Sequence, residues 1–186
     1  MFMRLFIAIE IPDEIKKEMV KVQEQLRKAN VDASWTRVEG MHLTLKFLGE
    51  VPETKITEIV SGLQSATEGI SQLRLEVKGV GTFPNPRNAR VVWIGLSGDT
   101  GKLTKLQEAV EDAMACIGLA RDERKFTAHL TLGRIRHVRS RDQWLAGLAE
   151  LSNRSLPGFD ATAVSLMKSE LKPSGAVYTE MGRAEL

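Results

Sequence analysis

Cysteine, tyrosine and histidine are scarce in this chain of 186 residues, which contains one, one and three of them, respectively. Because Cys116 is the only cysteine, the chain cannot form an intrachain disulfide or a cysteine-based zinc site. A single thiol suits a reducing cytoplasm, which is the location that we expect. Cys116 lies in an apolar helical pattern without a basic neighbour, and it is predicted to belong to the core.

Long apolar segments and Gly/Ser-rich linkers are also absent from the sequence. No stretch approaches the length of a bilayer-spanning helix, so no membrane partner is expected. The apolar segment from Phe2 to Ile11 is short, is interrupted by Arg4 and Glu10, and is not followed by a cleavage site of small residues. Without a linker, residues 1–186 are predicted to form a single two-lobed domain, which we expect to be a monomer.

The net charge is only +2, because 26 basic residues face 24 acidic ones, and this gives no overall signal for polyanion binding. One segment differs from the rest, since seven basic and three acidic residues lie between Arg121 and Asp142. A positive patch of this kind would attract an anionic substrate. The alternative is a solvated basic loop beside a strand.

Two of the three histidines lie in a repeated tetrapeptide, His-Leu-Thr-Leu, at residues 42–45 and 129–132. In an extended strand, successive side chains point to opposite faces. His42 and Thr44 therefore share one face, as do His129 and Thr131, while the leucines point to the other face. We expect the leucines to lie in a core and the histidines and threonines to face a cleft.

The spacing of apolar residues elsewhere predicts an α+β fold. Strands are predicted near residues 5–11, 41–48, 73–77, 91–96, 128–136, 161–171 and 176–184. Helices are predicted to begin at Pro12, Pro52, Thr100 and Ser140. Ser140 and Gln143 have the spacing of a capping box, and Pro173-Ser174-Gly175 is the predicted turn of a final hairpin.

The two halves of the chain are similar in their predicted elements, and each half contains one motif. We therefore predict a bilobal molecule with two antiparallel sheets, helices on the outer faces and a rough internal twofold symmetry. The two motif strands are expected to face each other across a catalytic cleft between the sheets.

Two imidazoles and two hydroxyls in one cleft suit acid–base chemistry at a phosphate ester. Because the ordinary pKa of histidine is about 6.5, one ring can accept a proton from water while the other donates a proton to a leaving oxygen. The threonine hydroxyls can donate hydrogen bonds to the non-bridging phosphate oxygens. This scheme uses no metal ion and no other cofactor, and none is expected.

Metal ligation, a serine nucleophile and a purely structural role are the alternatives for these residues. A zinc site usually needs a third protein ligand, and no Asp or Glu shares the predicted cleft face of either motif strand. A nucleophile elbow of the Gly-x-Ser-x-Gly type is absent from the sequence. The repetition of the motif in a matching strand context favours acid–base chemistry over structural histidines.

Longer segments around the motifs resemble those of a known superfamily. These segments are Arg4–Pro12, Trp35, His42–Glu50, Gly81–Pro84, Phe126–Arg134 and Ser169–Leu171 with Gly175. They span essentially the whole chain and resemble the two-histidine phosphoesterases, with the RNA 2′,3′-cyclic phosphodiesterase family, historically called 2′-5′ RNA ligase, as the most similar branch. Ala128 departs from the pattern, because many members have proline at this non-catalytic position.

The resemblance implies a bilobal fold and the hydrolysis of a terminal RNA 2′,3′-cyclic phosphate to a 2′-phosphate. His42 matches the proton donor of the family, and His129 matches its proton acceptor. Thr44 and Thr131 match the phosphate-binding threonines. Arg134 matches a basic residue of this branch, although strict alternation puts it on the face opposite His129 unless the strand bends or ends there.

Two further residues are candidates for substrate binding. Lys46 has the same parity as His42 and Thr44, so it is predicted either to approach the phosphate or to lie at the rim of the cleft. Phe6 lies on the strand face opposite the aliphatic residues, where it could stack on a base or pack under the neighbouring lobe.

Several functions stay open at this point. The first is hydrolysis of the cyclic phosphate, with RNA carrying cyclic-phosphate or 2′-phosphate ends, tRNA included, as the partner. The second is weak reversal of this reaction to form 2′-5′ bonds, for which no nucleotide-binding motif supplies energy. The chain could instead be an RNA-end binding protein without turnover, or a phosphodiesterase of a small cyclic nucleotide derivative.

Overall fold

The computed structural model describes residues 1–173 and 175–186, so the predicted turn residue Ser174 lies outside the described residues. The strands are β1 (Phe2–Glu10), β2 (Val31–Trp35), β3 (His42–Pro52), β4 (Leu73–Phe83), β5 (Val91–Gly98), β6 (His129–Val138), β7 (Ser155–Ala161), β8 (Ala163–Lys172) and β9 (Gly175–Glu185). The α-helices are α1 (Asp13–Arg27), α2 (Ile56–Thr67), α3 (Thr100–Cys116) and α4 (Arg141–Leu151). Short 3-10 helices span Val38–Gly40, Glu53–Lys55 and Pro86–Asn88.

The strands form two antiparallel sheets, as predicted. The four-stranded sheet has the order β3-β1-β8-β9, and the five-stranded sheet has the order β2-β6-β5-β4-β7. The first His-Leu-Thr-Leu motif begins β3, an edge strand, and the second begins β6, which lies between β2 and β5. Each motif thus belongs to a different sheet.

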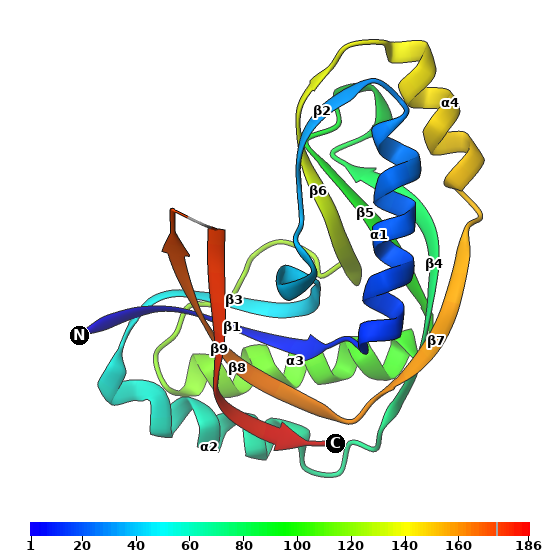
Figure 1. Cartoon of the computed structure of the whole chain (residues 1–186). Coiled ribbons are helices and arrows are strands. Elements are labelled where there is room, and N and C mark those ends of the chain that lie inside the picture. Colours follow the sequence, from blue (N-terminus) through cyan, green and yellow to red (C-terminus); the bar gives the residue numbers. More distant parts are fainter. Residues whose placement is uncertain (174) are drawn as a thin grey trace.

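Helices cover one face of each sheet (Figure 1). Helices α2 and α3 pack against β8, β9 and β3 of the four-stranded sheet, and α1 and α4 pack against strands of the five-stranded sheet. The two layered units meet at an angle, and their helix-free faces turn toward each other (Figure 1). The prediction of an α+β fold with helices on the outer faces is therefore confirmed.

The two sheets do not correspond to the two halves of the chain. The four-stranded sheet combines β1 and β3 with the C-terminal hairpin of β8 and β9, because β1 pairs with β8 from Leu5↔Lys168 to Ala8↔Ser165. Helix α1 follows β1 directly but packs on strands of the other sheet. The chain therefore passes repeatedly between the two layers.

Alternation and helical spacing decide which side chains form the core. Leu5, Ile7 and Ile9 of β1 are at most 1% exposed, and the leucines of both motifs are buried, as predicted. Ile15, Met19, Val22 and Leu26 form the buried stripe of α1. Burial of such apolar surface is the main driving force for the packing of each helix on its sheet.

Four local predictions are wrong. Strands β2 and β7 were not predicted, because β2 alternates over only five residues and β7 contains Pro157, which a sheet tolerates at the edge where β7 lies. Ser140 precedes α4, but its side chain makes no capping hydrogen bond. Cys116 is exposed, because it is the last residue of α3 and the helix has turned it away from the sheet.

Both motif strands contain a β-bulge at the leucine that follows the threonine. In β3 the pair Ala8↔Thr44 is followed by Ile7↔Lys46, which leaves Leu45 without a partner on β1. In β6 the pair Trp93↔Thr131 is followed by Val92↔Gly133, which leaves Leu132 without a partner on β5. A bulge of one residue reverses the faces of all residues beyond it.

The first bulge overturns the prediction for Lys46. Because Lys46 pairs with the buried Ile7, its side chain points into the core and not toward the cleft. Its Nζ donates hydrogen bonds to Oε2 of Glu111 at 2.5 Å and to the carbonyl of Ala120 at 2.7 Å, and its side chain is 1% exposed. Lys46 is thus a buried structural cation that joins β3 to α3.

The second bulge has the opposite effect on Arg134. Arg134 pairs with Val91, which lies two residues from Trp93 on β5, and Trp93 pairs with Thr131. Residues paired across a ladder share a face, as do residues two apart on a regular strand. Arg134 therefore lies on the same face of β6 as Thr131 and His129. The bulge is the break in strict alternation that this position requires.

The buried ion pair gives a stability prediction. Lys46→Met leaves the carboxylate of Glu111 buried without its cation, so we expect the free energy of unfolding to fall by about 3–5 kcal/mol. Urea denaturation at pH 7 measures this change. The double variant Lys46→Met/Glu111→Leu, which removes both charges, should recover most of the loss, and equal stability of the single variant and the wild type would contradict the buried pair.

Candidate active site

His42 is held in an aromatic cluster on the four-stranded sheet. Its ring stacks on Phe6 with centroids 4.7 Å apart and an interplanar angle of 28°. The ring of Tyr178 on β9 meets His42 edge-on at 5.5 Å and Phe6 edge-on at 5.8 Å. This packing fixes the His42 ring between β1 and β9, so Phe6 lies in the site as a direct neighbour of the histidine.

Burial makes His42 a weak base. Desolvation lowers the pKa of His42 to about 4, and the positive charge of Lys16 acts in the same direction. The ring is therefore neutral in the free protein near pH 7. A bound anion would oppose both effects, because negative charge beside the ring stabilises the imidazolium.

His129 lies in a second aromatic cluster on the five-stranded sheet. Phe83 meets its ring edge-on at 5.0 Å, and the centroid of Trp93 is 6.2 Å away. The Nδ1 atom of His129 lies 2.6 Å from the carbonyl oxygen of Thr127, which can only accept a hydrogen bond. In the neutral ring this contact puts the hydrogen on Nδ1 and leaves the lone pair of Nε2 free.

Two opposing effects act on the basicity of His129. Desolvation lowers the pKa of His129, and the hydrogen bond to Thr127 partly offsets this by favouring the protonated ring. The neutral ring, with a free Nε2, is thus the form that the site favours near pH 7. Such a ring can accept a proton.

The threonines of both motifs lie beside their histidines, as alternation predicts. Thr44 pairs with Ala8, which belongs to the small apolar cluster with Phe6, and Thr131 pairs with Trp93. Both threonines are half-buried. Strands β3 and β6 contact each other where the sheets meet, so the two motifs approach from different sheets.

Beyond each bulge, one residue returns to the cleft side. On β3 this residue is Phe47, which is 59% exposed and lies 6.1 Å from Phe6 between ring centroids. On β6 it is the exposed Arg134. The two sides of the site therefore differ in chemistry, since one presents an aromatic ring and the other a cation.

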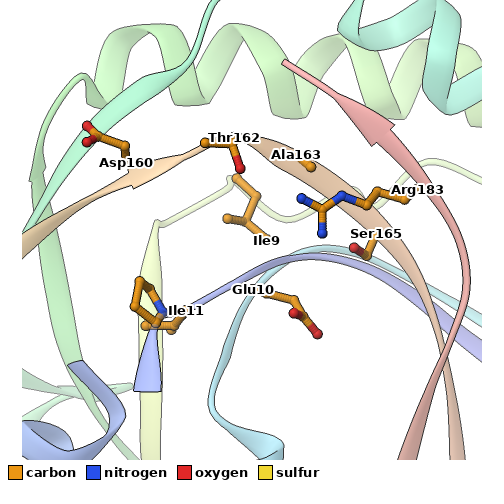
Figure 2. A pocket seen from close by; sticks show the side chains of 9 residues that line it. Ile9, Glu10, Ile11, Asp160, Thr162, Ala163, Ser165 and Arg183 are labelled. Carbon is orange, nitrogen blue, oxygen red and sulfur yellow. The ribbon is translucent and has the colours of Figure 1, made fainter. Parts of the chain in front are cut away.

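Two hollows border the His42 side of the site. One, of about 310 Å³, is lined by Arg37, Glu39 and Gly175–Tyr178, so that Tyr178 connects it to His42. The other, of about 220 Å³, is shown in Figure 2, where Glu10 and Arg183 approach it from different strands. Glu10 pairs with His42 across β1 and β3, which connects this hollow to the site as well.

Several residues of the site could not be assigned from the sequence. Tyr178, Phe83 and Trp93 reach the histidines from strands that are distant in sequence. Gln23 and Gln107 are buried under the motif strands. Their signal in the sequence is a single glutamine within the apolar stripe of an otherwise regular helix.

Two features of the described residues bear on other kinds of site. Within residues 1–173 and 175–186, no group of three or more His, Cys, Asp or Glu side chains could hold a metal ion. In the same part of the chain, no helix has both the length and the apolar character for a membrane span.

The chain matches the sequence model of the LigT like Phosphoesterase family twice, over residues 9–93 and 94–178. This repeat confirms the predicted internal duplication, and each copy contains one motif. An RNA 2′,3′-cyclic phosphodiesterase of Methanothermobacter thermautotrophicus is 33% identical over 97% of each chain. One of Thermotoga maritima is 35% identical over 95% of this chain and 91% of the relative. A crystal structure of a Thermus thermophilus protein is 26% identical with a TM-score of 0.81, and the match covers 99% of this chain and 98% of that one.

The low basicity of His42 gives a pH prediction. Between the unfolded pKa of 6.5 and the folded pKa of about 4, the unfolded chain binds more protons, so stability falls as pH falls. We expect His42 to contribute a loss of about 2 kcal/mol between pH 7 and pH 5, and His129 adds to it with the same sign.

Urea denaturation at several pH values measures this loss. In His42→Gln the slope of stability against pH in this window should become smaller. The exposed His137 lies on the same strand as His129, and His137→Gln should keep the slope of the wild type. An unchanged slope in His42→Gln would contradict the burial of a neutral His42.

Proposed function

Because the chain belongs to the LigT-like phosphoesterase family, we propose that it hydrolyses RNA 2′,3′-cyclic phosphate ends to 2′-phosphomonoesters through the paired histidines. The enzyme class, a hydrolase of cyclic phosphodiesters, follows from relatives that match nearly the full length of the chain. The observation that carries the choice of residues is the fixed tautomer of His129, whose free Nε2 is suited to take a proton from water.

His129 acts as the proton acceptor in this proposal. Its Nε2 removes a proton from a water molecule while the water oxygen forms a bond to phosphorus. The hydrogen bond from Nδ1 to the carbonyl of Thr127 stabilises the imidazolium that results. The bond between phosphorus and the 3′ oxygen breaks on the opposite side, as an in-line displacement requires.

His42 acts as the proton donor to the departing 3′ oxygen. It has to be protonated at that moment, although burial keeps its ring neutral in the free protein. The negative charge of the bound cyclic phosphate supplies the missing stabilisation, so His42 takes up its proton as the substrate binds. Once the 3′ hydroxyl is formed, both histidines return to their initial states by exchange with solvent.

The remaining groups bind the substrate. The hydroxyls of Thr44 and Thr131 donate hydrogen bonds to the non-bridging oxygens from two sides and stabilise the charge on them. Arg134 contributes positive charge from the exposed part of β6. Phe6 orients His42 by stacking on it, so its role is packing in the site and not base stacking alone.

The relatives are named for RNA, and RNA ends are the proposed substrate. A preference for tRNA, a monomeric state and a cytoplasmic location stay predictions. Weak 2′-5′ ligation is the reverse of the same displacement and needs no additional residue. The end-binding and small cyclic nucleotide hypotheses are tested by the same assay.

One prediction concerns activity. A short RNA that ends in a 2′,3′-cyclic phosphate, incubated with the protein and excess EDTA, should give a 2′-phosphate as the terminal group. His42→Ala and His129→Ala should each lower the rate by at least about a hundredfold, because each removes one partner of the proton transfers. Analysis of the terminal phosphate by chromatography measures both rate and regiochemistry.

The outcomes of this assay distinguish the hypotheses. RNA that binds to the wild type but is recovered unchanged would support the end-binding hypothesis. Turnover of a small cyclic nucleotide without turnover of RNA would favour the alternative substrate. Loss of activity in EDTA that returns with added metal would contradict the proposed chemistry.

A further prediction concerns proton uptake by His42. Sulfate is a suitable probe, because it does not titrate near neutral pH. We expect its binding at pH 6 to take up a fraction of a proton and to weaken as pH rises. Calorimetry in two buffers with different ionisation enthalpies measures the uptake, which should shrink in His42→Asn and persist in His137→Asn. Binding without uptake would argue against His42 as the donor.

A further inference from the structure

Two glutamines are buried within the apolar stripes of helices that cover different sheets. Gln23 on α1 is 4% exposed and lies between Val22 and Leu26, and Gln107 on α3 is 8% exposed. A buried amide is costly unless its donors and acceptors are satisfied. Both glutamines therefore need partners inside the protein.

One partner of each glutamine is equivalent in the two halves. Nε2 of Gln23 donates to the carbonyl of Leu132 at 2.7 Å and to the carbonyl of Thr36 at 2.8 Å. Nε2 of Gln107 donates to the carbonyl of Leu45 at 3.4 Å and to Oε1 of Glu111 at 3.3 Å. Leu45 and Leu132 are the last residues of the two His-Leu-Thr-Leu motifs, so each motif is contacted by one glutamine.

The contacted carbonyls belong to the residues at which the two bulges lie. Leu45 and Leu132 have no ladder partner on β1 and β5, respectively. The Leu132 carbonyl also accepts a hydrogen bond from the backbone N–H of Thr36 at 3.0 Å, so the amide of Gln23 is its second donor. The same contact recurs on two strands, from two helices, at the same position of the motif, and the two occurrences are independent observations.

We infer that Gln23 and Gln107 are positioning residues that fix the bulge at the end of each motif and so set the direction in which its histidine and threonine face the cleft. This inference rests on the proposed function. It concerns residues that touch neither water nor phosphate and that act through the backbone of the motif strands.

Removal of either glutamine amide is expected to change the register of the motif strand that it contacts. Without the amide donor, the bulge loses one of the contacts that hold it, and the strand can shift by one residue into a regular ladder, which reverses the faces of the residues beyond it. Lys46 or Gly133 would then occupy the place of Phe47 or Arg134. Even a partial movement of this kind tilts the preceding threonine, and displacements near 1 Å cost about a hundredfold in rate.

Methionine substitutions test the positioning role of the two glutamines. Gln23→Met and Gln107→Met keep the length of the side chain but remove the donor. We expect each to lower kcat by roughly tenfold or more on RNA with a cyclic phosphate end, because the reacting groups are misplaced, with a smaller change in KM. Gln25→Met is the matched control, since Gln25 is exposed on the same helix, and its kcat should equal that of the wild type.

A second readout separates positioning from a general loss of stability. The NMR signals of the His129 ring should shift in Gln23→Met while those of His42 stay, and Gln107→Met should show the reverse. Should a methionine variant not fold, Gln23→Asn and Gln107→Asn keep an amide that falls one methylene short of the carbonyl. They are expected to give the same pattern.

The outcomes are distinct. Folded variants with the kcat of the wild type and unshifted histidine signals would overturn the inference. Histidine signals that shift equally in both variants would overturn it as well, because a general loosening affects both sites. If the wild type does not hydrolyse the RNA, the proposed function fails, but the NMR experiment still tests whether each glutamine positions its own motif.

Discussion

The hydrogen bond from a buried glutamine amide to the carbonyl of the bulged leucine is the interaction on which both sides of the cleft depend. The bulges let each motif strand present a histidine and a threonine to the cleft and then turn a different residue inward. On β3 the inward residue is Lys46, and on β6 it is Gly133, where a side chain would meet the ring of Trp35 at 3.1 Å. The residues packed beneath the two motifs therefore fit the bulges, and this packing determines the shape of the cleft.

The two sides of the cleft share this backbone arrangement, but their histidines differ in how readily they take up a proton. His42 is enclosed by rings and is kept neutral by burial, whereas His129 is bonded to a carbonyl that stabilises its protonated form. The same motif thus gives one ring that takes up a proton only beside an anion and one ring that is ready to accept a proton. Surroundings contributed by Tyr178, and by the loop that carries Thr127, produce the difference.

Much of this arrangement could be predicted from the sequence, because it depends on local patterns. Alternation in 42–45 and 129–132 correctly placed the leucines in the core, and helical spacing located all four α-helices. The faces beyond the motifs could not be predicted, because alternation holds only within a regular ladder and a bulge depends on what packs beneath the strand. For this reason Lys46 was placed wrongly, the position of Arg134 stayed open, and Gln23 gave no sign of its partner on a distant strand.

The repeated passage of the chain between the two layers has a consequence for fragments of the protein. A cut between the two matched repeats, near residue 93, would leave strands of both sheets in each piece, because β1 and β3 belong with β8 and β9. Neither piece would contain a complete sheet, and neither could bury its helices alone. The two fragments would have to associate before either histidine had its neighbouring side chains. Proton donation by His42 and proton acceptance by His129 would therefore be restored together.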